Sequence, residues 1–135
     1  MNTITLSDLS QFTGTEEIHR NFLGFPYTDG IQYLAEQAKA YWLIDAIASY
    51  QYQLKRDEYL AYFQVWVLSV VGEGERKFPF ILPEENYKAV ITCWSDTPKE
   101  GIKPAVIQQI EYTKFPLIEI KLYVSGGVLM LPSEY

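Results

Sequence analysis

The stretch of residues 31–51 constrains the fold of this chain more than any other feature of the sequence. It contains no Pro or Gly and is rich in Ala and Leu, which predicts one long helix of roughly residues 30–51. Thr28 or Asp29 can accept hydrogen bonds from its first free backbone amides. Residues 41–48 are apolar on nearly every side, so we expect this half of the helix to be covered on more than one face.

Strand patterns follow that helix. Residues 61–71 are β-branched and aromatic on both alternating faces, which predicts a central strand with two covered faces. Further strands are expected at residues 88–94, 105–113 and 117–124, with a weaker one near 77–82. Ser125-Gly126-Gly127 predicts a tight hairpin into residues 128–131.

Helices first and strands afterwards are typical of the α+β class. We therefore expect one domain over residues 1–135, with one long buried aromatic helix packed on an antiparallel sheet of about 4–6 strands. Leu6 and Leu9 add a short N-terminal helix, which Thr5 or Ser7 can cap.

The charge and the cysteine content argue against several classes of function. The net charge is −6 and the basic residues are scattered, which argues against direct nucleic-acid binding. No apolar run approaches the ~20 residues of a membrane span, and the first residues do not form a signal-peptide pattern. Cys93 is the single cysteine, so neither an internal disulfide nor a Cys-rich zinc site can form. The expected location is the cytoplasm.

Asp45 is the most unusual residue of the predicted helix. In a continuous helix it shares a stripe with Ile31, Leu34, Ala38 and Trp42, and a buried carboxylate must be paired, hydrogen-bonded or protonated. One interpretation is a general base or ligand anchor with a raised pKa. The other is a structural carboxylate tied to Arg20, a Tyr hydroxyl or free backbone amides.

No cofactor or metal is expected from the sequence. Glu16-x-x-His19 has the spacing of half a di-iron site, but His19 is the single histidine, so the full site cannot be built. The same count excludes three-His and His-Glu-x-x-His zinc sites. For nucleophilic catalysis, Cys93 or a serine would need His19 as its base, and Cys93 lies within a predicted buried strand.

Tyr is unusually abundant, at 11 residues, and this favours an exposed recognition surface. Tyr50, Tyr52 and Tyr59 lie near a charged turn and are the tyrosines expected to be exposed. Together with Asp29 and Trp42 they are the candidate binding residues.

Several blocks over nearly the whole chain support a resemblance: Phe12-Thr13-Gly14-Thr15-Glu16, Tyr27-Thr28-Asp29-Gly30, Ala40-Tyr41-Trp42-Leu43-Ile44-Asp45, Phe63-Gln64-Val65-Trp66 and Leu131-Pro132-Ser133-Glu134-Tyr135. With these blocks the chain resembles a small bacterial family of unknown function, of a kind met in cyanobacteria and on phage or plasmid DNA. The resemblance implies a stand-alone domain and no particular activity.

Two functions from different classes remain open. The first is a non-enzymatic binding or accessory protein, for which the resemblance suggests a mobile-element origin. Its acidic aromatic surface would contact a partner protein or a second copy of the chain. The second is a small carboxylate-dependent enzyme, with Asp45 and either Asp29 or Glu16 near a pocket lined by Trp42 and tyrosines.

Overall fold

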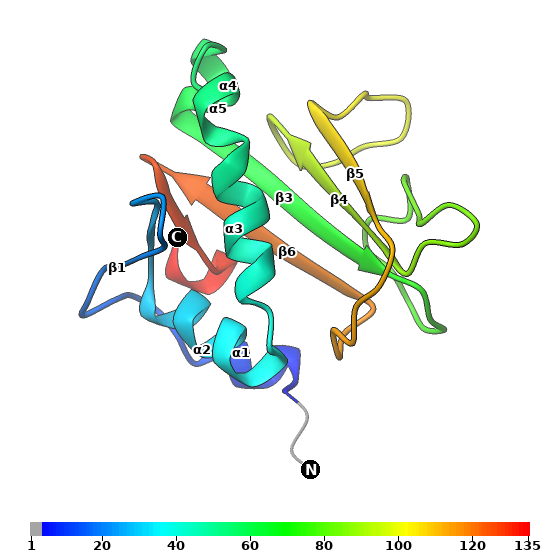
Figure 1. Ribbon diagram of the computed structural model, residues 1–135, viewed down its shortest axis with the longest axis horizontal. Helices are drawn as coiled ribbons and strands as arrows, with labels where there is room; N and C mark the ends of the chain where they lie inside the picture. Colours follow the sequence, from blue (N-terminus) through cyan, green and yellow to red (C-terminus); the bar gives the residue numbers. More distant parts are fainter. Residues whose placement is uncertain (1–3) are drawn as a thin grey trace.

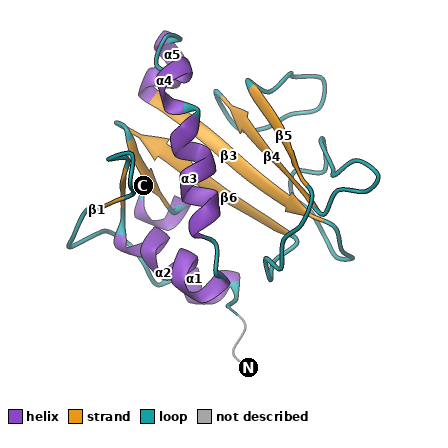
Figure 2. Ribbon diagram, viewed as in Figure 1, coloured by secondary structure: helices purple, strands orange, loops and turns teal. Residues whose placement is uncertain are grey.

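The computed structural model describes residues 4–135, which contain five α-helices, one short 3-10 helix and one seven-stranded sheet (Figures 1 and 2). The helices are α1 (Leu6–Ser10), α2 (Asp29–Ala38), α3 (Tyr41–Ser49), α4 (Gln51–Leu54), α5 (Glu58–Tyr62) and the 3-10 helix η1 (Pro132–Glu134). The strands are β1 (His19–Arg20), β2 (Pro26–Tyr27), β3 (Phe63–Val70), β4 (Ala89–Trp94), β5 (Val106–Ile110), β6 (Glu119–Ser125) and β7 (Val128–Met130). Both helices and strands were expected, and Thr5 caps α1 as predicted.

The sheet has more strands than expected and is not purely antiparallel. Its order is β1-β2-β7-β6-β3-β4-β5, and β2 pairs with β7 in parallel while the other pairs are antiparallel. The strands missing from the expectation are β1 and β2, two residues each. A strand of two residues is too short to show an alternation of apolar and polar side chains in the sequence. Such strands are extended because they pair with a distant segment of the chain.

The expected central strand is confirmed. β3 lies between β6 and β4, and nearly every one of its residues is buried. On one face its side chains join the main core beneath α2 and α3 (Figure 1). On the other face, Val65 and Val67 pack with Trp94 under Phe78 and Ile81. These two covering residues belong to the segment where a weak strand was expected; it forms no strand and instead shields the second face.

The prediction of one long helix is wrong, because the chain breaks between α2 and α3 (Figure 2). Lys39 adopts a left-handed conformation, with φ 55° and ψ 45°. The backbone N–H groups of Lys39 and Ala40 both donate to the carbonyl of Ala35, which ends α2 in the way a helix usually ends at glycine. Neither Gly nor Pro occurs at this position, so the local sequence does not predict the break.

The break also changes which side of the second helix is buried. An uninterrupted helix would continue the buried stripe of α2 through Trp42 and Asp45. In the structure, the buried side chains of α3 are those of Leu43, Ile44, Ile47 and Ala48. Asp45 is consequently half-buried rather than enclosed, and α3 has an open side, contrary to the expectation of cover on more than one face.

The hairpin between β6 and β7 forms as predicted. Ser125 pairs with Val128, and Gly126 and Gly127 both have positive φ, of 57° and 82°. A two-residue turn of this kind requires positive φ at both central positions, which glycine adopts without strain. Within residues 4–135, no helix combines the length and the apolar character needed to cross a membrane.

Candidate functional site

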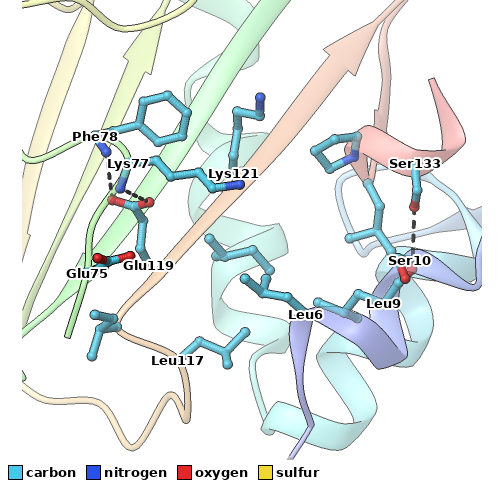
Figure 3. A pocket seen from close by; sticks show the side chains of 14 residues that line it. Leu6, Leu9, Ser10, Glu75, Lys77, Phe78, Leu117, Glu119, Lys121 and Ser133 are labelled. Carbon is cyan, nitrogen blue, oxygen red and sulfur yellow. Dashed lines mark hydrogen bonds between the residues drawn. The ribbon is translucent and has the colours of Figure 1, made fainter.

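An apolar groove of about 400 Å³ lies between β6 on one side and α1 with η1 on the other (Figure 3). Leu6 and Leu9 of α1 line one side of it, and Ile120 of β6, Leu131 and Pro132 also contribute to its lining. Its volume is within the range of small-ligand and peptide sites. None of the candidate binding residues chosen from the sequence lines it.

The groove exists because β7 is short. β7 pairs only with residues 123–125 of β6, so the preceding residues of β6 have no strand on that side. Leu131 is buried and Pro132 begins η1, which turns the chain away from the sheet. The edge of β6 beyond this turn is therefore open to the groove.

The register of β6 shows which backbone groups face the open edge. Val70 N–H donates to the carbonyl of Ile118 at 2.8 Å, and Leu68 lies opposite Ile120 in the same ladder. In an antiparallel ladder, alternate residues direct both backbone polar groups to the same neighbour. The even-numbered residues of β6 thus bond to β3, and Glu119 and Lys121 present their N–H and C=O groups to the groove.

The side chains of these two edge residues form the polar wall of the groove (Figure 3). The Glu119 carboxylate accepts hydrogen bonds from the backbone N–H groups of Lys77 and Phe78, at 2.9 and 3.0 Å. The Lys121 ammonium lies 5.4 Å from the centre of the Phe78 ring and 5.2 Å from that of Tyr123. Glu119 therefore has its charge satisfied by backbone donors, while Lys121 contacts aromatic faces and no carboxylate.

Asp45 does not lie in this groove. Its carboxylate accepts a hydrogen bond from the side-chain amide of Asn21 at 3.3 Å, whereas the Arg20 guanidinium donates to the carbonyl of Gly24. Burial, and then the nearby Asp45 charge, raise the pKa of the Tyr27 hydroxyl. Trp42 is half-buried and packs against the main core. Neither Trp42 nor Asp45 lines the groove.

The tyrosines divide into two groups. Tyr52 and Tyr59 are 79% and 71% exposed on α4 and α5, and the Arg56 guanidinium lies 5.3 Å from the centre of the Tyr52 ring. Tyr50 is half-buried: its hydroxyl donates to Gln108 at 2.7 Å, and its ring lies against Trp66. The exposed surface that the sequence suggests thus includes Tyr52 and Tyr59 without Tyr50.

Asp29 lies at the start of α2 beside the loop that leads into β1. Its carboxylate accepts hydrogen bonds from the backbone N–H groups of Glu16 and Glu17, and its other oxygen lies 2.9 Å from Nε2 of His19. The bond from Glu16 and then that from His19 hold the pKa of Asp29 below its ordinary value. The acid that faces His19 together with Asp29 is Glu17, and Glu16 contributes only its backbone to this cluster.

The C-terminal residues are joined to the start of α2. The Glu134 carboxylate accepts hydrogen bonds from the Thr28 hydroxyl at 2.6 Å and from the backbone N–H of Gly30 at 3.1 Å. An anion at this place also complements the positive end of the helix dipole. Two of the sequence blocks, residues 27–30 and 131–135, therefore meet in one structural contact that fixes η1 at the end of the groove.

Cys93 is unsuited to act as a nucleophile. It lies in β4 and is fully buried, and burial raises the pKa of its thiol to about 12. Nucleophilic attack requires the thiolate, which is essentially absent at neutral pH with such a pKa.

Sequence reasoning missed the groove for an identifiable reason. Pro132 directly after an expected strand signals that β7 ends there, while residues 117–124 predict a longer β6. The difference in length between the two strands of the hairpin was the available sign of an unpaired edge. That α1 lines the opposite wall depends on tertiary packing alone.

Comparison with known proteins identifies a family and nothing more specific. The model of the family described as "Family of unknown function (DUF6876)" matches residues 3–135. No curated protein and no solved structure matches the chain significantly. Because the match covers nearly the whole sequence, the chain belongs to this family of unknown function.

Proposed function

We propose that this domain is a non-catalytic binding protein that holds an extended segment of a partner protein along the free edge of β6. The observation that carries this proposal is the coincidence of that edge with the apolar groove (Figure 3). The segment would continue the track of β7, in the place that β7 leaves when the chain turns at Pro132. Its backbone would pair with the free N–H and C=O groups of Glu119 and Lys121.

A peptide strand suits this edge better than a small molecule. The edge offers donors and acceptors at alternate positions over residues 119–122 of β6, a length of roughly 13 Å at about 3.3 Å per residue. A second extended backbone can form hydrogen bonds with each of these N–H and C=O groups in turn, whereas a compact ligand reaches only some of them. We therefore expect a segment of about four residues in the groove.

The two walls determine the side chains that the segment needs. Residues pointing toward α1 would pack against Leu6, Leu9 and Ile120, so these positions favour apolar side chains. Residues pointing the other way would lie near Lys77 and Lys121. Neither lysine forms an ion pair with Glu75 or Glu119 of the same wall within residues 4–135, so an Asp or Glu of the segment can pair with a lysine there. The expected ligand alternates apolar and acidic residues, because successive side chains of a strand point to opposite faces.

The test is selection from a random heptapeptide library, followed by fluorescence polarisation with the selected peptides. We expect alternating apolar and acidic peptides with dissociation constants of about 1–100 µM. Leu6→Glu should weaken binding by about tenfold or more, because it places a charge in the apolar wall. Leu23→Glu is the matched control, since Leu6 and Leu23 are both 56% exposed and Leu23 does not line the groove.

Strand pairing itself is tested by two further measurements. Hydrogen exchange at the backbone amides of Glu119 and Lys121 should slow when the peptide binds, while that of Ile120, which already faces β3, should change little. Methylation of the peptide amides that face β6 should abolish binding. Binding that is insensitive to both Leu6→Glu and amide methylation would refute the proposal.

Other features of the expected binding protein remain proposals. The exposed Tyr52 and Tyr59 are candidates for a second contact with the partner, and self-association would appear in the same experiments as concentration-dependent protection of β6. The unpaired Cys93 is consistent with a cytoplasmic location, and a mobile-element origin stays a prediction. The enzyme alternative has less support, because Asp45 bonds to Asn21 outside the groove.

A further inference from the structure

Glu17, His19 and Asp29 form a compact cluster away from the groove. Each offers one potential ligand atom, and these atoms all lie within 4.8 Å of one another. His19 and Asp29 are partly buried and Glu17 is exposed, so the cluster is accessible from solvent. Nε2 of His19 and Oδ1 of Asp29 lie within hydrogen-bonding distance of each other, at 2.9 Å.

The local backbone explains why these three residues converge. His19 begins β1, and Glu17 lies two residues before it, with its carboxylate within 4.8 Å of the His19 ligand atom. β1 pairs with β2, His19 lies opposite Tyr27, and the two rings stack at 5.5 Å. Thr28 then caps α2, so that Asp29 begins the helix next to β1.

Contacts outside the cluster hold the Asp29 carboxylate in place. Its Oδ2 accepts from the backbone N–H of Glu16 at 2.9 Å, and its own N–H donates to the Thr15 hydroxyl at 2.9 Å. Oδ1 remains directed at His19. Carboxylates that bind metals are commonly held by hydrogen bonds from neighbouring groups, as Oδ2 of Asp29 is held here.

The donor set has the composition of an open transition-metal site. Two carboxylates compensate the charge of a divalent ion, and a neutral imidazole is a preferred ligand of zinc. Zinc–nitrogen and zinc–oxygen bonds of about 2.0–2.2 Å require ligand atoms about 3–3.5 Å apart. The 2.9 Å separation of His19 and Asp29 is close to that requirement, and exposed Glu17 can approach by a change of rotamer.

We propose that Glu17, His19 and Asp29 bind one divalent transition-metal ion of the zinc type, with the remaining coordination positions open to water or another ligand. The site goes beyond peptide binding in the groove and does not depend on it. Peptide binding can therefore fail without affecting this inference, and the reverse also holds.

The experiment is calorimetric titration of the metal-free protein with zinc chloride, with cobalt(II) absorption as a second readout. We expect one ion per chain and an intense visible cobalt band of a four-coordinate site. Glu17→Gln should weaken zinc binding by about tenfold or more, as expected for the loss of one of three protein ligands. His19→Gln should abolish the cobalt band.

Glu16→Gln is the matched control. Glu16 and Glu17 are adjacent exposed acids, but only Glu17 offers its carboxylate to the cluster. Glu16→Gln should therefore bind zinc as the unchanged protein does. Equal weakening by Glu16→Gln and Glu17→Gln, or no saturation below about 1 mM zinc, would mean nonspecific attraction to surface acids and would overturn the proposal. Because Glu17 is exposed, its substitution tests the site without putting the fold at risk.

Discussion

Substitution of Lys39 by glycine tests the break between α2 and α3, because the break predicts an increase in the free energy of unfolding and a continuous helix predicts a decrease. Lys39 has φ 55°, and this left-handed conformation costs a non-glycine residue about 1–2 kcal/mol. Glycine adopts it freely but loses about 0.5–1 kcal/mol more backbone entropy on folding. The Lys39 side chain is exposed, so its removal costs no core packing. The difference predicts that Lys39→Gly raises the free energy of unfolding by about 0.5–1 kcal/mol.

A continuous helix would give the opposite result. Glycine in a helix interior destabilises a protein by about 1 kcal/mol relative to alanine. The measurement is urea denaturation followed by circular dichroism, with an expected rise in melting temperature of about 2–4 °C as an independent check. Lys39→Ala is the control: it shortens the side chain but keeps the β-carbon that disfavours this conformation, so its stability should stay within about 0.5 kcal/mol of the original. If Lys39→Gly were less stable than Lys39→Ala, the residue would be helical and the account of the break would be wrong.

Two further predictions concern Gly30 and Cys93. Gly30→Ala should destabilise the protein by about 1–3 kcal/mol, although alanine normally favours a helix, because the new β-carbon would collide with the Glu134 carboxylate and lie 2.7 Å from Leu131 Cδ1. Gly14→Ala is its control, with no atom within 4 Å of the added carbon, and equal stability of the two variants in urea would contradict the packing described. The Cys93 thiol, with a pKa of about 12, should resist alkylation at pH 8 until urea unfolds the chain, and rapid labelling of the folded protein would refute its burial. Because the thiol of the unfolded chain ionises near the ordinary cysteine pKa of 9.0 while the folded one stays neutral, stability should also fall as pH rises from 9 toward 12, and this part of the loss should be missing in Cys93→Ala.

The sequence determined those parts of the fold that depend on neighbouring residues. Thr28 can cap a helix because its hydroxyl accepts the backbone N–H of Ile31 three residues later. The hairpin at Gly126 and Gly127 follows from the positive φ that a two-residue turn demands. Runs of apolar side chains placed β3 and β4, because a strand between two covered faces needs apolar residues on both, and alternation of apolar side chains placed β6.

Tertiary structure decided the rest, including both candidate sites. Lys39 takes a strained conformation that its own sequence disfavours, because the packing of α2 and α3 on one sheet over-determines it, and this moves Asp45 out of the core. The groove depends on a turn at Pro132 that Glu134 fixes through the start of α2, more than a hundred residues earlier in the chain. Glu17, His19 and Asp29 meet only because β1 pairs with β2, and strands of two residues leave no periodic signal. Local preference therefore sets the elements of this protein, while the contacts between distant segments determine which of their edges and carboxylates are available for binding.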